Sequence, residues 1–216
     1  MSLFKRYTIF IIAVVIQSCG IALVVKSLLG TSPISSFPYV LSIIFPMTLG
    51  EFTFIFNMLL VLLQLILLKK NFHRIQFLQV PMTFIFAVSI DVFMALFSFI
   101  NTDIYLLKFL ILLIGASFVS LGVALQGIAN VLMLPGEGVV YAISRKFKFD
   151  FGKVKTFNDV TLVTLAIITS YYYLGRIEGI REGTLISALI TGTIAKFFLH
   201  HLSSVDKQGN LVLHLH

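Results

Sequence analysis

The chain has 216 residues, of which 58% are hydrophobic and 12% are charged, and its mean hydropathy is +1.03. This composition excludes an ordinary soluble globular domain and predicts an integral membrane protein. The net charge of +7 does not indicate nucleic-acid binding, because Lys and Arg of membrane proteins concentrate in cytoplasmic loops. The single cysteine, Cys19, lies in an apolar run and predicts neither a disulfide framework nor a redox role.

Six apolar runs are long enough to cross a membrane, for which a helix needs roughly 20 residues. They cover residues 6–28, 52–69, 76–99, 105–128, 157–175 and 184–201. No convincing cleavage site follows the first run, so we interpret it as a retained helix and not as a signal peptide. Two further segments, 33–46 and 135–146, are shorter, and each begins with a proline, which suits the start of a helix.

The two short segments belong to an internal repeat with an ungapped offset of 102 residues. Matched positions include the pairs Gly20/Gly122, Pro33/Pro135, Tyr39/Tyr141, Ser42/Ser144, Gly50/Gly152 and Arg74/Arg176. We therefore predict an all-α, polytopic membrane protein with a two-fold internal repeat. Its single transmembrane domain covers residues 1–201, with repeats of about 5–100 and 105–201, and residues 202–216 form a short polar cytoplasmic tail.

The short segments can be re-entrant, returning to the side from which they started, or can cross fully. With a cytoplasmic N-terminus, re-entrance places 12 of the 16 Lys and Arg residues in the cytoplasm, and full crossing places 10 there. The charge distribution favours re-entrance and cytoplasmic N- and C-termini. Six crossings, three in each repeat, would orient the repeats oppositely, an inverted architecture common among secondary transporters.

The starts of the two short segments form the candidate solute site. Broken backbone at membrane depth is tolerated only against protein or a water-filled cavity. The start of such a half-helix directs unpaired N–H groups and the positive end of the helix dipole into the protein, where an anion or a carboxylate can bind. The candidate substrate-binding residues are Thr31, Ser32, Ser35, Ser36, Asn57, Glu137, Gly138 and Asp159. Helix capping and packing is the alternative role for the hydroxyl groups and for Asp159.

Two acids are candidates for proton coupling, because ionisable residues inside a bilayer are costly and are often functional. Asp91 is the most deeply placed acid, with a structural ion pair as its alternative role, and Glu137 begins the second short segment. Arg181 and Glu182 precede the last helix, where they can cap it or can partner Glu137 or the solute.

We predict no metal site, no cofactor and no enzymatic activity. The histidines His200, His201, His214 and His216 lie near the end of the chain, where such residues are usually solvated. The sequence contains no phosphate-binding loop, no nucleotide-binding glycine motif, no metal-ligand spacing and no nucleophile elbow.

Four stretches resemble the YczE/YyaS/YitT family of bacterial integral membrane proteins. They are LGTSPISSFPYVLS, ANVLMLPGEGVVYAIS, FGKVKTFNDVTLV and IEGIREGT, and the resemblance extends from the first helix to about residue 200. It implies a small multi-pass protein of the bacterial cytoplasmic (inner) membrane with a duplicated unit, and it implies no substrate.

The leading hypothesis is a transporter or exporter of a small polar or anionic solute, with its site between repeats that rock against each other. The alternative is a non-transporting accessory protein that supports a partner or a biosynthetic assembly. A water-sized cavity at the two proline segments would favour the transporter, and a filled core there would favour the accessory protein. The expected partners are the lipid bilayer and the solute, with homo-oligomerisation possible and nucleic acid excluded.

Overall fold

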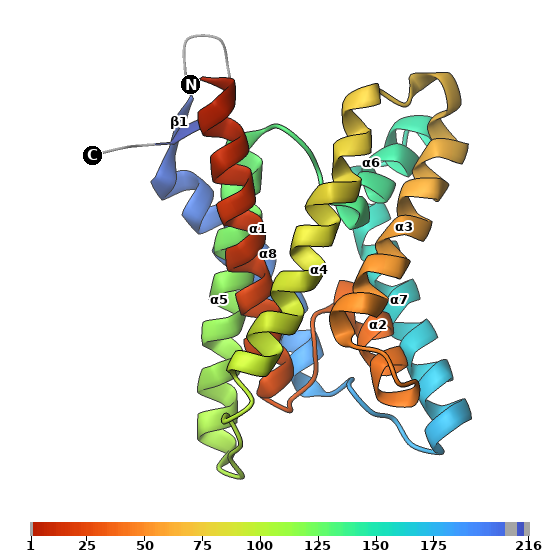
Figure 1. Ribbon diagram of the computed structural model, residues 1–216, viewed down its shortest axis with the longest axis vertical. Helices are drawn as coiled ribbons and strands as arrows, with labels where there is room; N and C mark the ends of the chain where they lie inside the picture. Colours follow the sequence, from red (N-terminus) through yellow and green to blue (C-terminus); the bar gives the residue numbers. More distant parts are fainter. Residues whose placement is uncertain (1, 206–210, 214–216) are drawn as a thin grey trace.

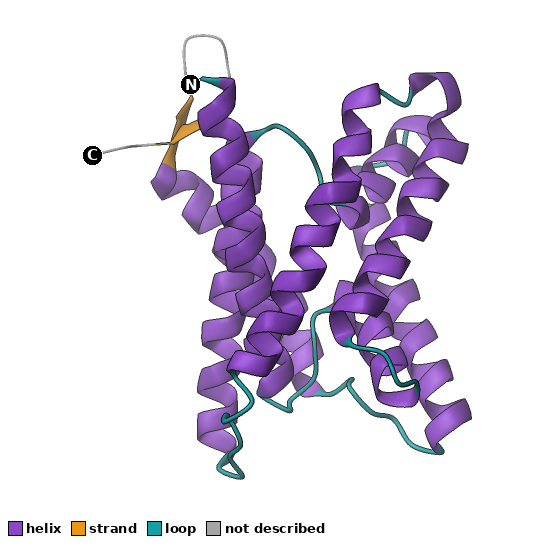
Figure 2. Ribbon diagram, in the orientation of Figure 1, coloured by secondary structure: helices purple, strands orange, loops and turns teal. Residues whose placement is uncertain are grey.

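The structure is a computed structural model that describes residues 2–205 and 211–213. This described part contains α1 (Leu3–Lys26), α2 (Pro33–Ile44), α3 (Leu49–Leu68), α4 (Gln79–Leu96), α5 (Tyr105–Ala129), α6 (Pro135–Phe147), α7 (Phe151–Leu174) and α8 (Glu182–Leu202). Two 3₁₀ turns, η1 (Lys69–Asn71) and η2 (Arg74–Leu78), connect α3 to α4. An antiparallel strand pair, β1 (Ser203–Val205) and β2 (Leu211–Leu213), follows α8 (Figure 2).

Each of the eight predicted segments forms a helix, and the chain is a multi-pass membrane protein. Five helices are long and apolar enough to span a membrane: α1, α3, α4 together with η2, α5 and α8. Helix α7 does not meet this criterion, because Asn158 and Asp159 lie in its first half and three tyrosines, Tyr171 to Tyr173, in its last turns. The prediction of six spans is therefore confirmed for five. The strand pair was not predicted, since the sequence indicated only a polar tail there.

Corresponding helices of the two halves of the chain run in opposite directions (Figure 1). Helix α1 runs from the upper to the lower end of the molecule in this view, and α5 runs from the lower to the upper end. Helix α2 starts in the interior and runs toward the lower end, whereas α6 starts in the interior and runs toward the upper end. The starts of α5, α6 and α7 lie 102 residues after those of α1, α2 and α3, which is the offset of the sequence repeat.

Helices from the two halves of the chain interleave. Helix α1 packs most extensively against α5, while α2 packs on α7 and α3 packs on α6. One group of contacting helices contains α1, α4, α5 and α8, and the other contains α2, α3, α6 and α7. The α3–α4 contact joins the two groups, together with a smaller contact between α2 and α8. Because each group combines helices of both halves, the packing does not divide into two repeats that could rock as separate bodies.

Three glycines allow α1 and α5 to approach closely. A Cβ atom added at Gly20 would lie 2.5 Å from the backbone nitrogen of Val119 and 2.7 Å from the carbonyl oxygen of Gly115. A Cβ atom at Gly122 would lie 2.7 Å from the Cβ of Gln17. Small residues at such crossings bring helix backbones together in membranes. The repeat-matched pair Gly20 and Gly122 therefore marks this crossing.

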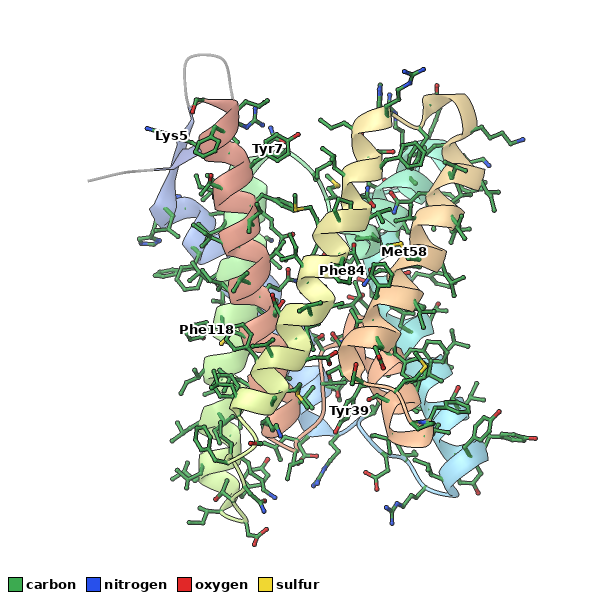
Figure 3. The ribbon with its side chains drawn as sticks, in the orientation of Figure 1. Lys5, Tyr7, Tyr39, Met58, Phe84 and Phe118 are labelled. Atoms are coloured by element: carbon green, nitrogen blue, oxygen red, sulfur yellow. The ribbon has the colours of Figure 1, made fainter. Side chains whose placement is uncertain are left out.

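The outer surface is apolar, and the interior holds polar side chains. Phe118 projects from the outer side of α5 (Figure 3), and Phe157 and Leu189 are 74% and 76% exposed. In contrast, Gln64 and Thr83 are fully buried. A soluble protein distributes these residue types the other way round, so the surface is suited to lipid.

Candidate solute-binding site

The first turns of α2 and α6 meet in the interior of the molecule. A Cβ atom at Gly136 would collide with the Cδ1 atom of Ile34, so the side chain of Ile34 packs directly on the backbone of α6 at this glycine. A cavity of about 30 Å³ lies beside the contact, where one water needs roughly 10–15 Å³. The cavity therefore has room for about two waters or one small ion. Its polar lining consists of Gln17, Ser35, Thr53, Asn57 and Glu137, and its apolar lining of Ile34, Pro38, Phe56, Phe86, Leu134 and Gly136.

In the described structure, both helix starts near this cavity lack a side-chain cap. Pro33 and Pro135 are the first residues of α2 and α6, and neither helix has a side-chain N-cap hydrogen bond within the described chain. The N-cap residue of α2, Ser32, donates its hydroxyl to Ser35 Oγ at 3.0 Å, and the N-cap residue of α6, Leu134, has no side-chain oxygen. The first N–H groups of a helix have no intrahelical acceptor, so two positive helix ends converge here.

Helix α3 presents a free hydroxyl to the cavity. Thr53 is only 5% exposed, and its Oγ1 has no hydrogen-bond partner among the described residues. One helical turn further on, Asn57 donates Nδ2 to the Thr53 carbonyl oxygen at 2.8 Å. Sequence analysis found Asn57 and missed Thr53. The four-residue spacing, which places both residues on one face of a helix, is the signal that would have found it.

Two carboxyl groups lie close together at this site. Glu137 lines the cavity from the first turn of α6, and its charge interacts with that of Asp159 on α7. Asp159 Oδ2 lies 3.7 Å from Lys155 Nζ, and Asp159 Oδ1 is buried without a hydrogen-bond partner in the described structure. Glu137 is therefore the acid that lines the cavity, and Asp159 is a neighbouring acid outside its lining.

Five predicted site residues do not line the cavity: Thr31, Ser32, Ser36, Gly138 and Asp159. The N–H of Thr31 donates to Thr184 Oγ1 at 3.2 Å, and the Ser36 hydroxyl donates to the Pro33 carbonyl oxygen at 2.6 Å. Gly138 packs against Gln64, and a Cβ atom there would lie 2.6 Å from the amide oxygen of Gln64. The contacts of Ser36 and Gly138 fit the alternative role of capping and packing. The contact of Thr31 is made by its backbone, and its buried Oγ1 has no hydrogen-bond partner among the described residues.

Asp91 lies on α4 beside the N-terminus of α3, away from the cavity. Its Oδ2 accepts a hydrogen bond from the Thr48 hydroxyl at 2.6 Å, and its Oδ1 accepts one from the N–H of Gly50 at 2.8 Å. Thr48 and Glu51 also form a reciprocal capping box at the start of α3. Asp91 therefore supports a helix end through backbone and hydroxyl donors, where the sequence suggested a Lys or Arg partner. Its role in proton coupling stays a prediction.

Arg181 and Glu182 hold the loop that precedes α2. They pair with each other at 3.5 Å, and Arg181 Nη1 donates to the Leu28 carbonyl oxygen at 3.4 Å. On the opposite side of the fold, Arg6 Nε donates to the Ala129 carbonyl oxygen at 2.7 Å and so holds the loop that precedes α6. These contacts join Arg181 to a loop, and the described structure does not show the suggested pairing of Arg181 or Glu182 with Glu137.

Two buried amides position the start of α6. Gln64 Nε2 donates to the Pro135 carbonyl oxygen at 3.2 Å and to Gln79 Oε1 at 3.2 Å. Gln79 Nε2 donates back to Gln64 Oε1 at 3.3 Å. These bonds fix the first residue of α6 against α3 and α4, so they orient the helix end that faces the cavity.

Among the described residues, no group of three or more His, Cys, Asp and Glu side chains is placed to hold a metal ion. His214 and His216 lie outside the described residues. Comparison with curated proteins and with solved structures gives no match. A family model, that of the family of unknown function DUF6198, matches residues 4–200. The chain therefore belongs to the DUF6198 family.

Proposed function

We propose that the protein is a transporter or exporter of a small polar or anionic solute. The observation that carries the proposal is the cavity where the first turns of α2 and α6 meet, lined from both halves of the chain. Broken membrane helices whose starts face a shared cavity are a frequent form of solute site in transporters. The free hydroxyl of Thr53, the amide of Asn57 and the unpaired N–H groups supply hydrogen-bond donors to such a solute.

We also propose six crossings arranged as an inverted repeat, with α7 as the sixth. Its 24 residues match the length of α1 and exceed the roughly 20 needed to span. The opposed directions of α1 and α5, and of α2 and α6, support inversion (Figure 1). Because α2 and α6 each run from the interior toward one end, we propose that both are re-entrant.

We propose that the protein lies in a bacterial cytoplasmic membrane with both termini in the cytoplasm. The start of α1, the α3–α4 connection and the end of α6 lie at the same end of the molecule (Figure 1). This end carries Lys5, Arg6, Lys69, Arg74 and Arg145, whereas the opposite end carries fewer basic residues. Excess positive charge marks the cytoplasmic side. The motifs shared with the YczE/YyaS/YitT family support the same location and a relationship to that family.

The proposed transport movement takes place between the two groups of helices, because each group contains helices of both repeats. The group of α1, α4, α5 and α8 contributes Gln17 and Phe86 to the cavity, and the group of α2, α3, α6 and α7 contributes Ser35, Thr53 and Glu137. Sliding or rocking of one group on the other would open the cavity to alternate sides. The small cavity volume corresponds to a closed conformation in this movement.

A thermal-shift screen of the detergent-purified protein tests whether a solute binds. The probes are chloride, nitrate, formate, small carboxylates, amino acids and amines, because a ligand that binds only the folded protein raises its melting temperature. We expect a hit among the small anions, reduced in Ser35→Ala. The matched control is Ser42→Ala, since the Ser42 hydroxyl bonds to the Tyr39 carbonyl oxygen within α2 and does not line the cavity.

A hit that Ser35→Ala leaves unchanged would place the binding site elsewhere. The absence of any hit across the panel, together with co-purification of a stoichiometric protein partner, would contradict the transporter and favour the accessory protein.

A further inference from the structure

We propose that the cavity binds a small monovalent anion and that this anion displaces the ionised form of Glu137, so that each anion enters together with one proton. The inference rests on the proposed function and names its solute class and its coupling ion. Three independent observations carry it: the donors around the cavity, the position of Glu137 and the size of the cavity.

The donors around the cavity favour an anion. The starts of α2 and α6 converge there without side-chain caps in the described chain, and the dipole of each helix is positive at its start. Thr53 lines the cavity and is only 5% exposed. Its hydroxyl lacks a hydrogen-bond partner among the described atoms. An unpaired buried hydroxyl costs free energy, and a bound anion would supply the missing acceptor.

Glu137 occupies the place where an anion would bind. It lies in the first turn of α6 and lines the same cavity as Thr53 and Ser35. A carboxylate at this position interacts with the same helix end as a bound anion. The Glu137 carboxylate is therefore the competitor that occupies the positive helix ends when no anion is present.

The cavity is too small to separate two negative charges. A volume of about 30 Å³ holds one small ion beside Glu137, so an anion and an ionised carboxylate would be in contact. Two like charges in contact inside a protein repel each other strongly, because the protein interior screens them less than water does. Protonation of Glu137 removes this repulsion and turns the carboxyl group into a donor toward the anion.

The charged groups near Glu137 do not replace this proton. On α7, Asp159 adds a second negative charge, and Lys155 lies 3.7 Å from Asp159 and partners that residue. From α1, α2, α3 and α4, the described lining contributes uncharged side chains, among them Gln17, Ser35 and Asn57. Among the described residues that line the cavity, Glu137 is thus the one with a charged side chain.

The charge of the site is the same before and after an anion binds. The empty site holds the Glu137 carboxylate with one negative charge. The occupied site holds the anion and the neutral carboxylic acid, also with one negative charge, because one proton has joined a carboxylate oxygen. Transport of the anion with its proton therefore moves no net charge across the membrane.

Isothermal calorimetry with chloride, nitrate and formate tests the inference at pH 5.5 and pH 7.5. For the probe that binds most tightly, we expect affinity to fall with rising pH, by up to about tenfold per pH unit where Glu137 is ionised in the empty site, because one proton is linked to each anion. In Glu137→Gln, which keeps a neutral donor, affinity should be the same at both pH values. In Asp159→Asn the pH dependence should persist, because Asp159 does not line the cavity.

Proton uptake by the wild-type protein gives a test that does not depend on any variant folding. In weakly buffered solution at pH 7.5, saturation with the probe should take up about one proton for each anion bound. An uptake of zero, or the same pH dependence in Glu137→Gln as in the wild type, would overturn the inference while leaving anion binding in place. A pH dependence lost in Asp159→Asn and kept in Glu137→Gln would assign the proton to Asp159 and overturn the role of Glu137.

Failure of all three probes to bind at either pH would also overturn the inference. The proposed function would then stand only if another solute raised the melting temperature in a manner sensitive to Ser35→Ala. The two proposals can therefore fail separately.

Discussion

Thr53 offers the sharpest residue-scale test of the cavity. Thr53→Val replaces the unpartnered hydroxyl with a methyl group of similar size, so stability should be unchanged or slightly higher. Anion affinity should fall about ten- to a hundredfold, since hydrogen bonds to charged groups contribute about 1.5–3 kcal/mol. Calorimetry and thermal unfolding measure the two effects on the same samples.

Thr83→Val is the matched control for this substitution. Thr83 is also fully buried, and its Oγ1 also lacks a partner in the described structure, but it does not line the cavity. Equal losses of affinity in the two variants would show that the loss does not arise from the cavity, and the site would have to be placed elsewhere.

Substitution of Asp91 should lower the stability of the protein and leave anion binding unchanged. Asp91→Asn weakens the hydrogen bonds that its carboxylate accepts from Thr48 and Gly50, at a cost of about 1–2 kcal/mol in the free energy of unfolding. Asp103→Asn, on the exposed connection between α4 and α5, should lower the melting temperature less. A normal melting temperature with lost proton-coupled uptake in Asp91→Asn would instead support Asp91 as a proton carrier.

At the residue scale, sequence analysis predicted part of the site. Ser35, Asn57 and Glu137 line the cavity, and their signals were the proline starts, the repeat offset and the cost of an acid in a membrane. Thr31 and Asp91 carry the same signals but bond to other helices. Which polar residue meets a neighbour and which meets a cavity depends on helix packing, and a single sequence does not specify that packing.

At the scale of the elements, the glycine crossing of α1 and α5 should be essential for folding. Gly20→Val would place a branched side chain against the backbone of Val119 and Gly115. Overpacking of this kind costs about 1–3 kcal/mol, and backbone contacts leave little room for relaxation. We expect a lower melting temperature and a lower yield of monodisperse protein in gel filtration.

Gly192→Ala is the matched control for the crossing. Gly192 lies within α8, and an added Cβ atom would meet nothing within 4 Å among the described atoms. Alanine favours a helix over glycine by about 1 kcal/mol, so this variant should be as stable as the wild type or more stable. A Gly20→Val protein as stable as Gly192→Ala would contradict the close approach of α1 and α5.

The elements themselves were largely readable from the sequence. Proline at the first position of α2 and of α6 set their starts, and the apolar runs set the positions of the long helices. The ends of the helices in the structure differ from the predicted ends by a few residues. Hydropathy does not detect capping residues such as Thr48 and Glu51, which form the capping box of α3. Hydropathy alone is a limited measure of whether a helix spans a membrane. The hydroxyl groups of the tyrosines at the end of α7 lower its mean hydropathy, although α7 is as long as α1.

For the whole molecule, the interleaved packing of the two repeats could not be predicted. The offset of 102 residues indicates that two units are alike, but it does not indicate whether each unit folds on itself or exchanges contacts with the other. The contacts of α2 with α7 and of α3 with α6 show exchange. The moving parts of a transporter built this way are groups of helices and not the sequence repeats.

Cysteine labelling from the two sides of the membrane tests the proposed topology. In a Cys19→Ser background, single cysteines replace Met47, Asp103 and Lys148, which lie in exposed connections. Re-entrant α2 and α6 place Met47 and Asp103 on the side opposite Lys148, so an impermeant maleimide added to intact cells should label the first two and spare the third. Full crossing of both short helices would put all three on the side of the N-terminus, so the same result at all three positions, labelled or unlabelled, would contradict the inverted arrangement.

The most direct test of the account is anion flux into proteoliposomes that contain the purified protein. The account predicts saturable uptake of a small monovalent anion, driven by an inward proton gradient and slowed in Thr53→Val but not in Thr83→Val. Uptake that equals the leak of protein-free vesicles, at every pH and with every probe that binds, would contradict transport through this cavity.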